Sequence, residues 1–113
     1  MEQARIDRHS QPCCPVERTL QVIGGKWTVL ILHELFNGTK RFGELSLSLV
    51  GISPKTLSER LKELEVEGVV TRTVYPEVPP RVEYMLTEKG QSLNAIIEAM
   101  RVWGLAWENK EPG

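Results

Sequence analysis

Residues 52–68 read ISPKTLSERLKELEVEG, a stretch that carries both the start and the stop signals of a helix. Ser53 is a good N-cap, because its hydroxyl can accept a hydrogen bond from a backbone N–H that the helix leaves without a partner. Pro54 falls at the first helical position, where its missing N–H group needs no acceptor. Gly68 supplies the left-handed residue that commonly ends a helix. The stretch therefore predicts a helix over about residues 53–67.

The predicted helix has an apolar face and a polar face. Leu57, Leu61 and Leu64 follow the i, i+4, i+7 spacing of residues that face a hydrophobic core. The opposite face and its flanks carry Lys55, Thr56, Ser58, Glu59 and Lys62. An isolated amphipathic helix would leave these side chains in solvent, so their function depends on the elements around the helix.

The neighbouring segments predict a helix-turn-helix followed by a hairpin. A short helix of about residues 42–49 comes first, and two helices joined by so short a turn form a helix-turn-helix. After the second helix, residues 69–75 are rich in β-branched side chains and residues 81–87 alternate between apolar and polar. The loop PEVPP at residues 76–80 contains three prolines, which fix φ, so we expect it to project as a stiff loop.

Two further helices precede these elements. Pro15 opens the first, and Gly24 and Gly25 close it. The second runs from about residue 26 to residue 36. The order of four helices and then a hairpin is typical of a winged helix-turn-helix, so the predicted fold is mainly α with a small β-hairpin wing.

A last helix is predicted over about residues 88–107. Its apolar stripe consists of Leu93, Ile96, Ile97, Met100, Trp103 and Trp107. One interpretation packs this stripe on the chain's own core, and the other shares its far end with a second copy of the chain. We favour a homodimer, with an interface formed by Ile97, Met100, Trp103 and Trp107, because a symmetric dimer places two reading heads about 34 Å apart on DNA.

The composition fits a single globular domain of 113 residues, of which 41% are hydrophobic and 26% charged. We expect a flexible arm at residues 1–12, the domain at residues 13–108 and a tail at residues 109–113. No apolar run approaches the ~20 residues that span a bilayer, and the N-terminus has no secretory core, so we expect no membrane contact and a cytoplasmic location. The net charge of −1 permits DNA binding without indicating it.

In a winged helix-turn-helix, the second helix of the motif enters the major groove and its first residues read the bases. Lys55, Thr56 and Ser58 are donors at the start of that helix, and Glu59 could accept a hydrogen bond from a cytosine amino group. Arg41 either contacts phosphate or is a simple surface charge. The predicted DNA-binding residues are Arg41, Ser53, Lys55, Thr56, Ser58, Glu59, Lys62 and Arg81, with the wing loop 76–80 beside the helix.

Five segments in this order resemble the HxlR-type winged-helix transcriptional regulators, which are related in design to MarR-type proteins. The segments read GGKW at 24–27, RFGEL at 41–45, GIS at 51–53, LSERLKEL at 57–64 and PPRVEYMLT at 79–87. The resemblance implies a dimeric bacterial or archaeal regulator that binds a pseudo-palindromic DNA operator sequence-specifically. The chain departs from the family at residues 46–48, which read SLS where family members often carry an arginine.

Two cysteines, Cys13 and Cys14, are adjacent, and a disulfide between neighbours would be strained because their Cα atoms are too close. Neither cysteine forms a CxxC pair, and His9 and His33 lack metal-ligand spacing, so we expect no metal. Cys14 is the predicted N-cap before Pro15, and a helix N-terminus favours the thiolate. By the family resemblance, Cys14 is the candidate thiol that senses oxidants or electrophiles; the alternative is a half-buried cysteine without a regulatory role.

Two other functions compete with a DNA-binding regulator. A winged helix can serve as a protein–protein interaction module without DNA binding, which would show no salt-dependent binding to DNA. A small thiol enzyme would need a base beside the cysteine, and the only histidine near Cys14 in the sequence is His9, in the predicted arm. The chain has no Gly-rich phosphate loop, paired-carboxylate site or metal motif. We therefore predict a regulator that is not an enzyme and uses no cofactor.

Overall fold

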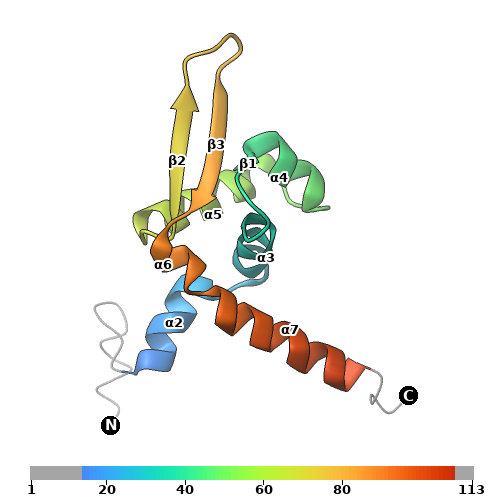
Figure 1. The fold of residues 1–113 in the computed structure, drawn as a ribbon. Helices are drawn as coiled ribbons and strands as arrows, with labels where there is room; N and C mark the ends of the chain where they lie inside the picture. Colours follow the sequence, from blue (N-terminus) through green and yellow to red (C-terminus); the bar gives the residue numbers. More distant parts are fainter. Residues whose placement is uncertain (1–13, 109–113) are drawn as a thin grey trace.

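The computed structural model describes residues 14–108 of the chain. The predicted arm at 1–12, Cys13 and the predicted tail at 109–113 lie outside the described residues. In chain order (Figure 1) the elements are α2 (Pro15–Ile23), α3 (Lys26–Leu35), β1 (Lys40–Arg41), α4 (Phe42–Ser48), α5 (Pro54–Val66), β2 (Val70–Tyr75), β3 (Arg81–Leu86), α6 (Glu88–Gln91) and α7 (Asn94–Glu108).

The α4–α5 pair forms the predicted helix-turn-helix. The Ser53 hydroxyl accepts a hydrogen bond from the Thr56 backbone N–H at 3.1 Å, as expected of an N-cap. Gly68 follows α5 with φ at +78°, a left-handed conformation that glycine adopts readily. The three leucines of the predicted core face, Leu57, Leu61 and Leu64, are at most 2% exposed. The sequence prediction for this helix is confirmed.

The sheet is antiparallel, with strand order β1-β3-β2. Strands β2 and β3 pair from Val70 opposite Leu86 to Tyr75 opposite Arg81, and the hairpin stands out from the helical body (Figure 1). Strand β1 is a third strand of only two residues that pairs with β3, with Arg41 opposite Glu83. This short strand was not predicted, because two residues show no periodicity. The winged helix-turn-helix fold, mainly α with a hairpin wing, is confirmed.

One hydrophobic core joins the helices to the base of the sheet. Side chains from α3, α4 and α5 meet Val69, Tyr84 and Leu86 there, all of them less than 9% exposed. This burial supplies most of the free energy that holds the helix-turn-helix against the sheet. In the described part of the chain, no helix is long and apolar enough to cross a membrane.

The C-terminal region differs from the single helix predicted over residues 88–107. It consists of the short α6 and the longer α7, which a turn at residues 92–93 separates. In this turn the Leu93 N–H bonds to the Gly90 carbonyl at 3.0 Å, a bond between residues three apart that replaces the helical pattern. Leu93 and Ile97 then enter the core, whereas α7 beyond them projects away from the body (Figure 1).

The position of Ile97 requires a correction. We predicted this residue for the dimer interface, but its side chain is only 4% exposed and belongs to the chain's own core. The reason is the turn before α7, which directs the first part of the helix toward the body. The beginning of the apolar stripe therefore packs on the chain's own core, and its far end is exposed. A contact between this far end and a second copy stays a prediction.

Candidate nucleic-acid interface

The polar face of α5 is open to solvent. Lys55, Ser58, Glu59 and Lys62 are exposed, and Thr56 is half-buried. Because their backbone is fixed by the leucines on the opposite face, these side chains form a defined surface at the start and middle of the helix. Donors at this position suit both base edges and phosphates.

Ser53, also predicted to bind DNA, has its hydroxyl engaged at the cap. Its Oγ accepts from the Thr56 backbone N–H and lies 3.0 Å from the Thr56 Oγ1. Two of the hydrogen bonds that a serine hydroxyl can make are therefore within the helix. The Ser53 hydroxyl therefore orients Thr56 and is not a free donor for DNA.

A groove of about 500 Å³ runs between α5 and the hairpin. Ser58 and Lys62 line it from the helix, and Arg72, Val82 and Tyr84 line it from the sheet. Arg72 lies directly opposite Tyr84 across the β2–β3 pair, so both side chains are on the sheet face that meets α5. The groove thus has one cation on each wall, Lys62 and Arg72, and one anion, Glu65, on the helix wall.

Sequence reasoning missed Arg72, although a signal for it existed. A hairpin loop at residues 76–80 makes Tyr75 and Arg81 partners, and counting back along both strands pairs Arg72 with Tyr84. Since Tyr84 belongs to the apolar side of the alternating segment 81–87, the same count places Arg72 on that side of the sheet. The register of the hairpin therefore predicts a cation beside the helix.

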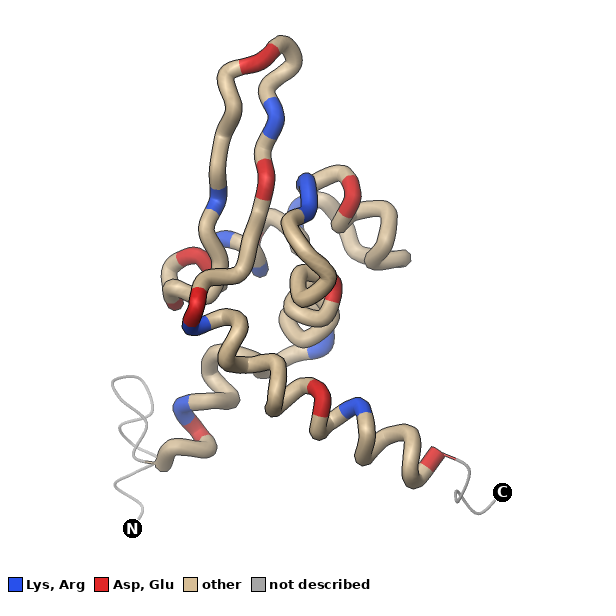
Figure 2. The backbone as a smooth tube through the Cα atoms, in the orientation of Figure 1, with Lys and Arg blue, Asp and Glu red and all other residues tan. Residues whose placement is uncertain are grey.

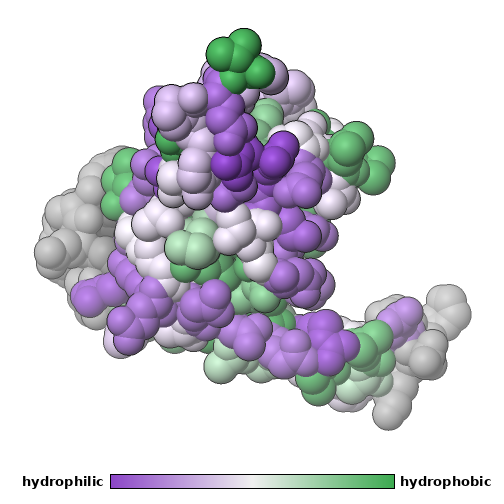
Figure 3. Space-filling view, turned by 45° about the horizontal axis from the view of Figure 1, so that its top comes forward, coloured by the Kyte–Doolittle hydropathy of each residue, from purple (hydrophilic) through white to green (hydrophobic). Residues whose placement is uncertain are grey.

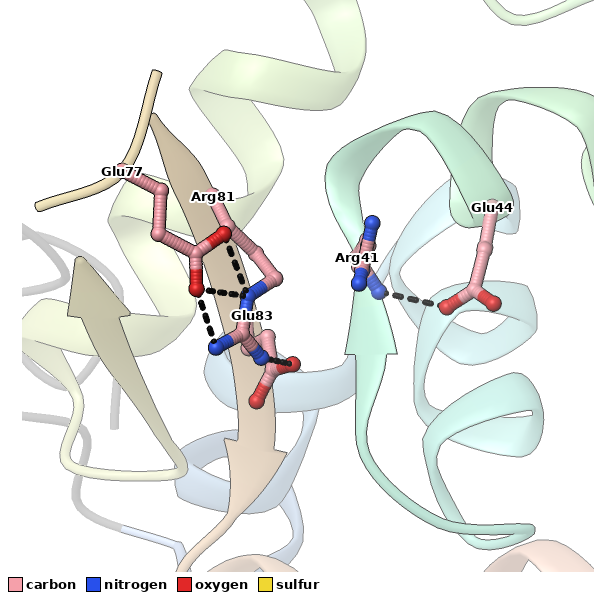
Figure 4. A network of polar contacts seen from close by, with 5 residues as sticks. All are labelled: Arg41, Glu44, Glu77, Arg81 and Glu83. Atoms are coloured by element: carbon pink, nitrogen blue, oxygen red, sulfur yellow. Dashed lines mark hydrogen bonds and ion pairs between the residues drawn. The ribbon is translucent and has the colours of Figure 1, made fainter. Parts of the chain in front are cut away.

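Arg81, the predicted wing contact, is held within the hairpin (Figure 4). Its Nη2 lies 2.8 Å from Glu77 Oε2, its Nε donates to the same carboxylate at 3.2 Å, and its Nη1 lies 2.6 Å from Glu83 Oε2. The guanidinium carbon also stacks 3.8 Å from the centre of the Tyr75 ring. We call Tyr75, Glu77, Arg81 and Glu83 the wing arginine cluster.

The electrostatics of the wing arginine cluster agree with its geometry. Hydrogen bonds to Glu77 and Glu83 raise the pKa of Arg81 above its ordinary value, and the hydrogen bond from Arg81 lowers the pKa of Glu77. Along the hairpin, acidic and basic residues alternate, and an acidic segment lies at the tip (Figure 2). The tip is also apolar (Figure 3), because Val78 is fully exposed there.

Arg41 lies beside the hairpin at the start of α4. Its backbone N–H donates to Glu44 Oε1 at 2.8 Å, which closes the first turn of that helix (Figure 4). A second groove, of about 330 Å³, is lined by Arg41, Phe42 and the hairpin loop, including Glu77. The Arg41 charge contributes to the lowered pKa of Glu77, so the two side chains interact across this groove.

The far end of α7 carries an exposed apolar surface. Met100, Trp103 and Trp107 are 48%, 67% and 54% exposed, and the two tryptophan rings lie 6.2 Å apart. In the space-filling view (Figure 3), hydrophobic residues are visible along the lower edge of this helix, below its hydrophilic side. Contiguous exposed apolar side chains of this size commonly mark an interaction surface.

Cys14 occupies the predicted N-cap of α2. Its thiol is free and exposed, and its side chain makes no capping hydrogen bond. Its carbonyl accepts the Arg18 N–H at 3.0 Å, which begins the helix. Among the described residues, no group of three or more His, Cys, Asp or Glu side chains could hold a metal ion.

The arrangement of α4, α5 and the wing recurs in known proteins. Residues 22–112 match the family described as HxlR-like helix-turn-helix. The chain belongs to this family. The resemblance predicted from the five sequence segments is thereby confirmed, and the family is one of transcriptional regulators.

Individual relatives agree with the assignment. An HTH-type transcriptional regulator from Synechocystis is 42% identical over 96% of this chain and 84% of its own length. The reduced form of the redox regulator HypR is 44% identical, with a TM-score of 0.81 over 84% of this chain and 94% of HypR. Diamide-treated YodB from B. subtilis is 43% identical, with a TM-score of 0.70 over 86% of this chain and 97% of YodB.

Proposed function

We propose that the protein is a homodimeric transcriptional regulator that binds a pseudo-palindromic site on double-stranded DNA. The observation that carries this proposal is the exposed, donor-rich start of α5, which a leucine face holds against the core while the wing stands beside it. In this arrangement α5 enters the major groove and the loop 76–80 lies against the adjacent backbone. A regulator of bacterial or archaeal DNA would act in the cytoplasm, without membrane contact.

The exposed residues divide into two groups by position. Lys55, Thr56, Ser58 and Glu59, at the start of α5, face the bases, and Ser53 positions Thr56. Lys62 and Arg72, on the two walls of the groove, bind a phosphate, as does Arg41 at the start of α4. Phosphate contacts fix the register of the protein on the duplex, and base contacts give sequence preference.

The exposed end of α7 forms the dimer interface in this proposal. Met100, Trp103 and Trp107 would meet the same residues of a second copy across a two-fold axis. Burying tryptophan and methionine side chains against each other supplies the hydrophobic contact typical of such interfaces. The two copies of α5 would then read two half-sites of one operator.

We further propose that Cys14 is the thiol through which oxidants or electrophiles alter DNA binding. Its exposure at the start of α2 gives a reagent access to the thiol. HypR is described as a redox regulator in reduced and oxidised forms, and YodB was captured after diamide treatment. On oxidation, Cys14 would form a disulfide with a thiol of another molecule rather than with its neighbour Cys13.

The sensing proposal is tested by measuring DNA affinity with and without diamide. Wild-type protein and Cys13→Ser should lose or gain affinity on treatment, whereas Cys14→Ser should not respond. A Cys14→Ser protein that responds like wild type would remove Cys14 from the mechanism.

The DNA-binding proposal is tested by selecting duplex fragments of the source genome and measuring their affinity over a salt series. The proposal predicts that the logarithm of affinity falls linearly with the logarithm of salt, by about 0.9 per phosphate contacted. An interaction module for other proteins would select no fragment and would show no such dependence.

A further inference from the structure

Within the wing arginine cluster, the two glutamates occupy the guanidinium N–H groups of Arg81 that would otherwise be free to bind a DNA phosphate. Nε and Nη2 both donate to the Glu77 carboxylate, and Nη1 donates to Glu83. The Nε–Nη2 edge of a guanidinium is also one that holds a phosphate with two parallel hydrogen bonds. Glu77 and a phosphate group cannot both occupy this edge.

The charges of the hairpin also oppose phosphate binding by the wing. Residues 70–86 contain two basic side chains, Arg72 and Arg81, and two acidic ones, Glu77 and Glu83, so their formal sum is zero. Arg72 belongs to the groove beside α5, which leaves the outer part of the wing with one positive and two negative charges. A wing with this balance gives no net attraction to a phosphate backbone.

The two glutamates differ in accessibility. The Glu77 side chain is 51% exposed in the loop, whereas the Glu83 side chain is 21% exposed within β3. Exposed ion pairs are weak, because water and salt screen both partners. The Glu77–Arg81 pair can therefore open when a phosphate approaches, while Glu83 and the Tyr75 ring keep Arg81 at the edge of the wing.

We propose that Glu77 competes with DNA phosphate for Arg81 and so lowers the affinity of the wing for any duplex. This inference rests on the proposed function and adds an affinity-setting residue to it. Because the competition is independent of base sequence, it weakens operator and unrelated DNA alike. Sequence preference then depends more heavily on the residues of α5.

The test is the variant Glu77→Gln in the full chain, which removes the competing charge and keeps the size of the side chain. Its affinity should rise for a selected operator fragment and for an unrelated duplex. One additional phosphate contact steepens the salt slope by about 0.9, so a roughly fourfold rise in salt should shrink the increase about 3.5-fold. Glu17→Gln on α2 makes the same change in net charge away from the wing and should behave like wild type.

The second measurement shows whether Glu77 acts through Arg81. In an Arg81→Ala background, Glu77→Gln should no longer raise affinity. An undiminished increase in that background would overturn the proposal, because it would mean that Glu77 acts on the duplex directly or through Arg41 and not through Arg81.

The remaining outcomes separate this inference from the proposed function. If wild type shows salt-dependent binding but Glu77→Gln binds with wild-type or lower affinity, competition by Glu77 is wrong and DNA binding stands. If neither wild type nor Glu17→Gln binds duplex DNA, the proposed function itself fails, and the inference fails with it.

Discussion

At the scale of single residues, two arginines of the hairpin differ through the strand face on which they lie. Arg72 shares the face of buried Tyr84 and reaches the groove beside α5, whereas Arg81 is on the other face with Tyr75 and Glu83. Because successive side chains of a β-strand point to opposite faces, Arg72 faces α5 and Arg81 lies on the outer face of the wing. Only the first is placed to bind phosphate without breaking ion pairs within the hairpin.

Replacing Arg72 by alanine should accordingly weaken binding to all duplexes by a similar factor. The loss of one phosphate contact should also make the salt slope shallower by about 0.9. Arg18→Ala, which removes an exposed arginine of α2, is the matched control and should leave both quantities unchanged. An effect confined to one DNA sequence would show that Arg72 reads a base instead.

At the scale of elements, α6 packs so closely against the sheet that only glycine fits at residue 90. A Cβ atom on Gly90 would lie 2.3 Å from the Val69 carbonyl oxygen and 2.9 Å from Leu86 Cδ2. The first neighbour is backbone and cannot move aside alone. This close approach fixes α6 over the end of the hairpin and sets the direction from which α7 leaves the body.

The variant Gly90→Ala should therefore lower the free energy of unfolding by about 1–3 kcal/mol, as overpacking in a core does. Gly104→Ala is the control, because a Cβ atom there meets nothing within 4 Å and should stabilise helix α7 by up to ~1 kcal/mol. Urea unfolding of both variants measures the difference. Equal stabilities would contradict the packing described for α6.

These elements show how far the sequence predicts the fold. Local signals, such as the Ser53 cap and the leucine spacing, gave the helix-turn-helix and hairpin with nearly the observed bounds. The two-residue β1 and the turn before α7 arise from contacts with distant segments, which local patterns do not record. The same limit applies to the site: the exposed face of α5 followed from periodicity, but the pairing of Arg81 with Glu77 required the folded hairpin.

At the scale of the whole molecule, the exposed end of α7 and the start of α5, which is proposed to bind DNA, lie on different parts of the structure (Figure 1). A second copy can therefore cover Met100, Trp103 and Trp107 without blocking α5. This separation is what a dimeric regulator requires, because the contact between copies and the contact with DNA must form together.

Replacing Trp103 by alanine should weaken dimerisation by about 2 kcal/mol or more, as expected when a buried interface tryptophan is truncated. Arg101→Ala changes the opposite face of α7 and should leave the dimer intact. Sedimentation velocity over a range of protein concentrations distinguishes the two. A Trp103→Ala protein that associates like wild type would place the dimer contact elsewhere.

The most direct test of the account is the affinity of Lys55→Ala for a selected operator fragment and for an unrelated duplex. With Lys55 reading a base from the start of α5, the variant should lose about 1–3 kcal/mol on the operator and much of its preference over the unrelated duplex. Arg18→Ala should lose neither. Wild-type affinity and preference in Lys55→Ala would contradict the assignment of α5 to the major groove.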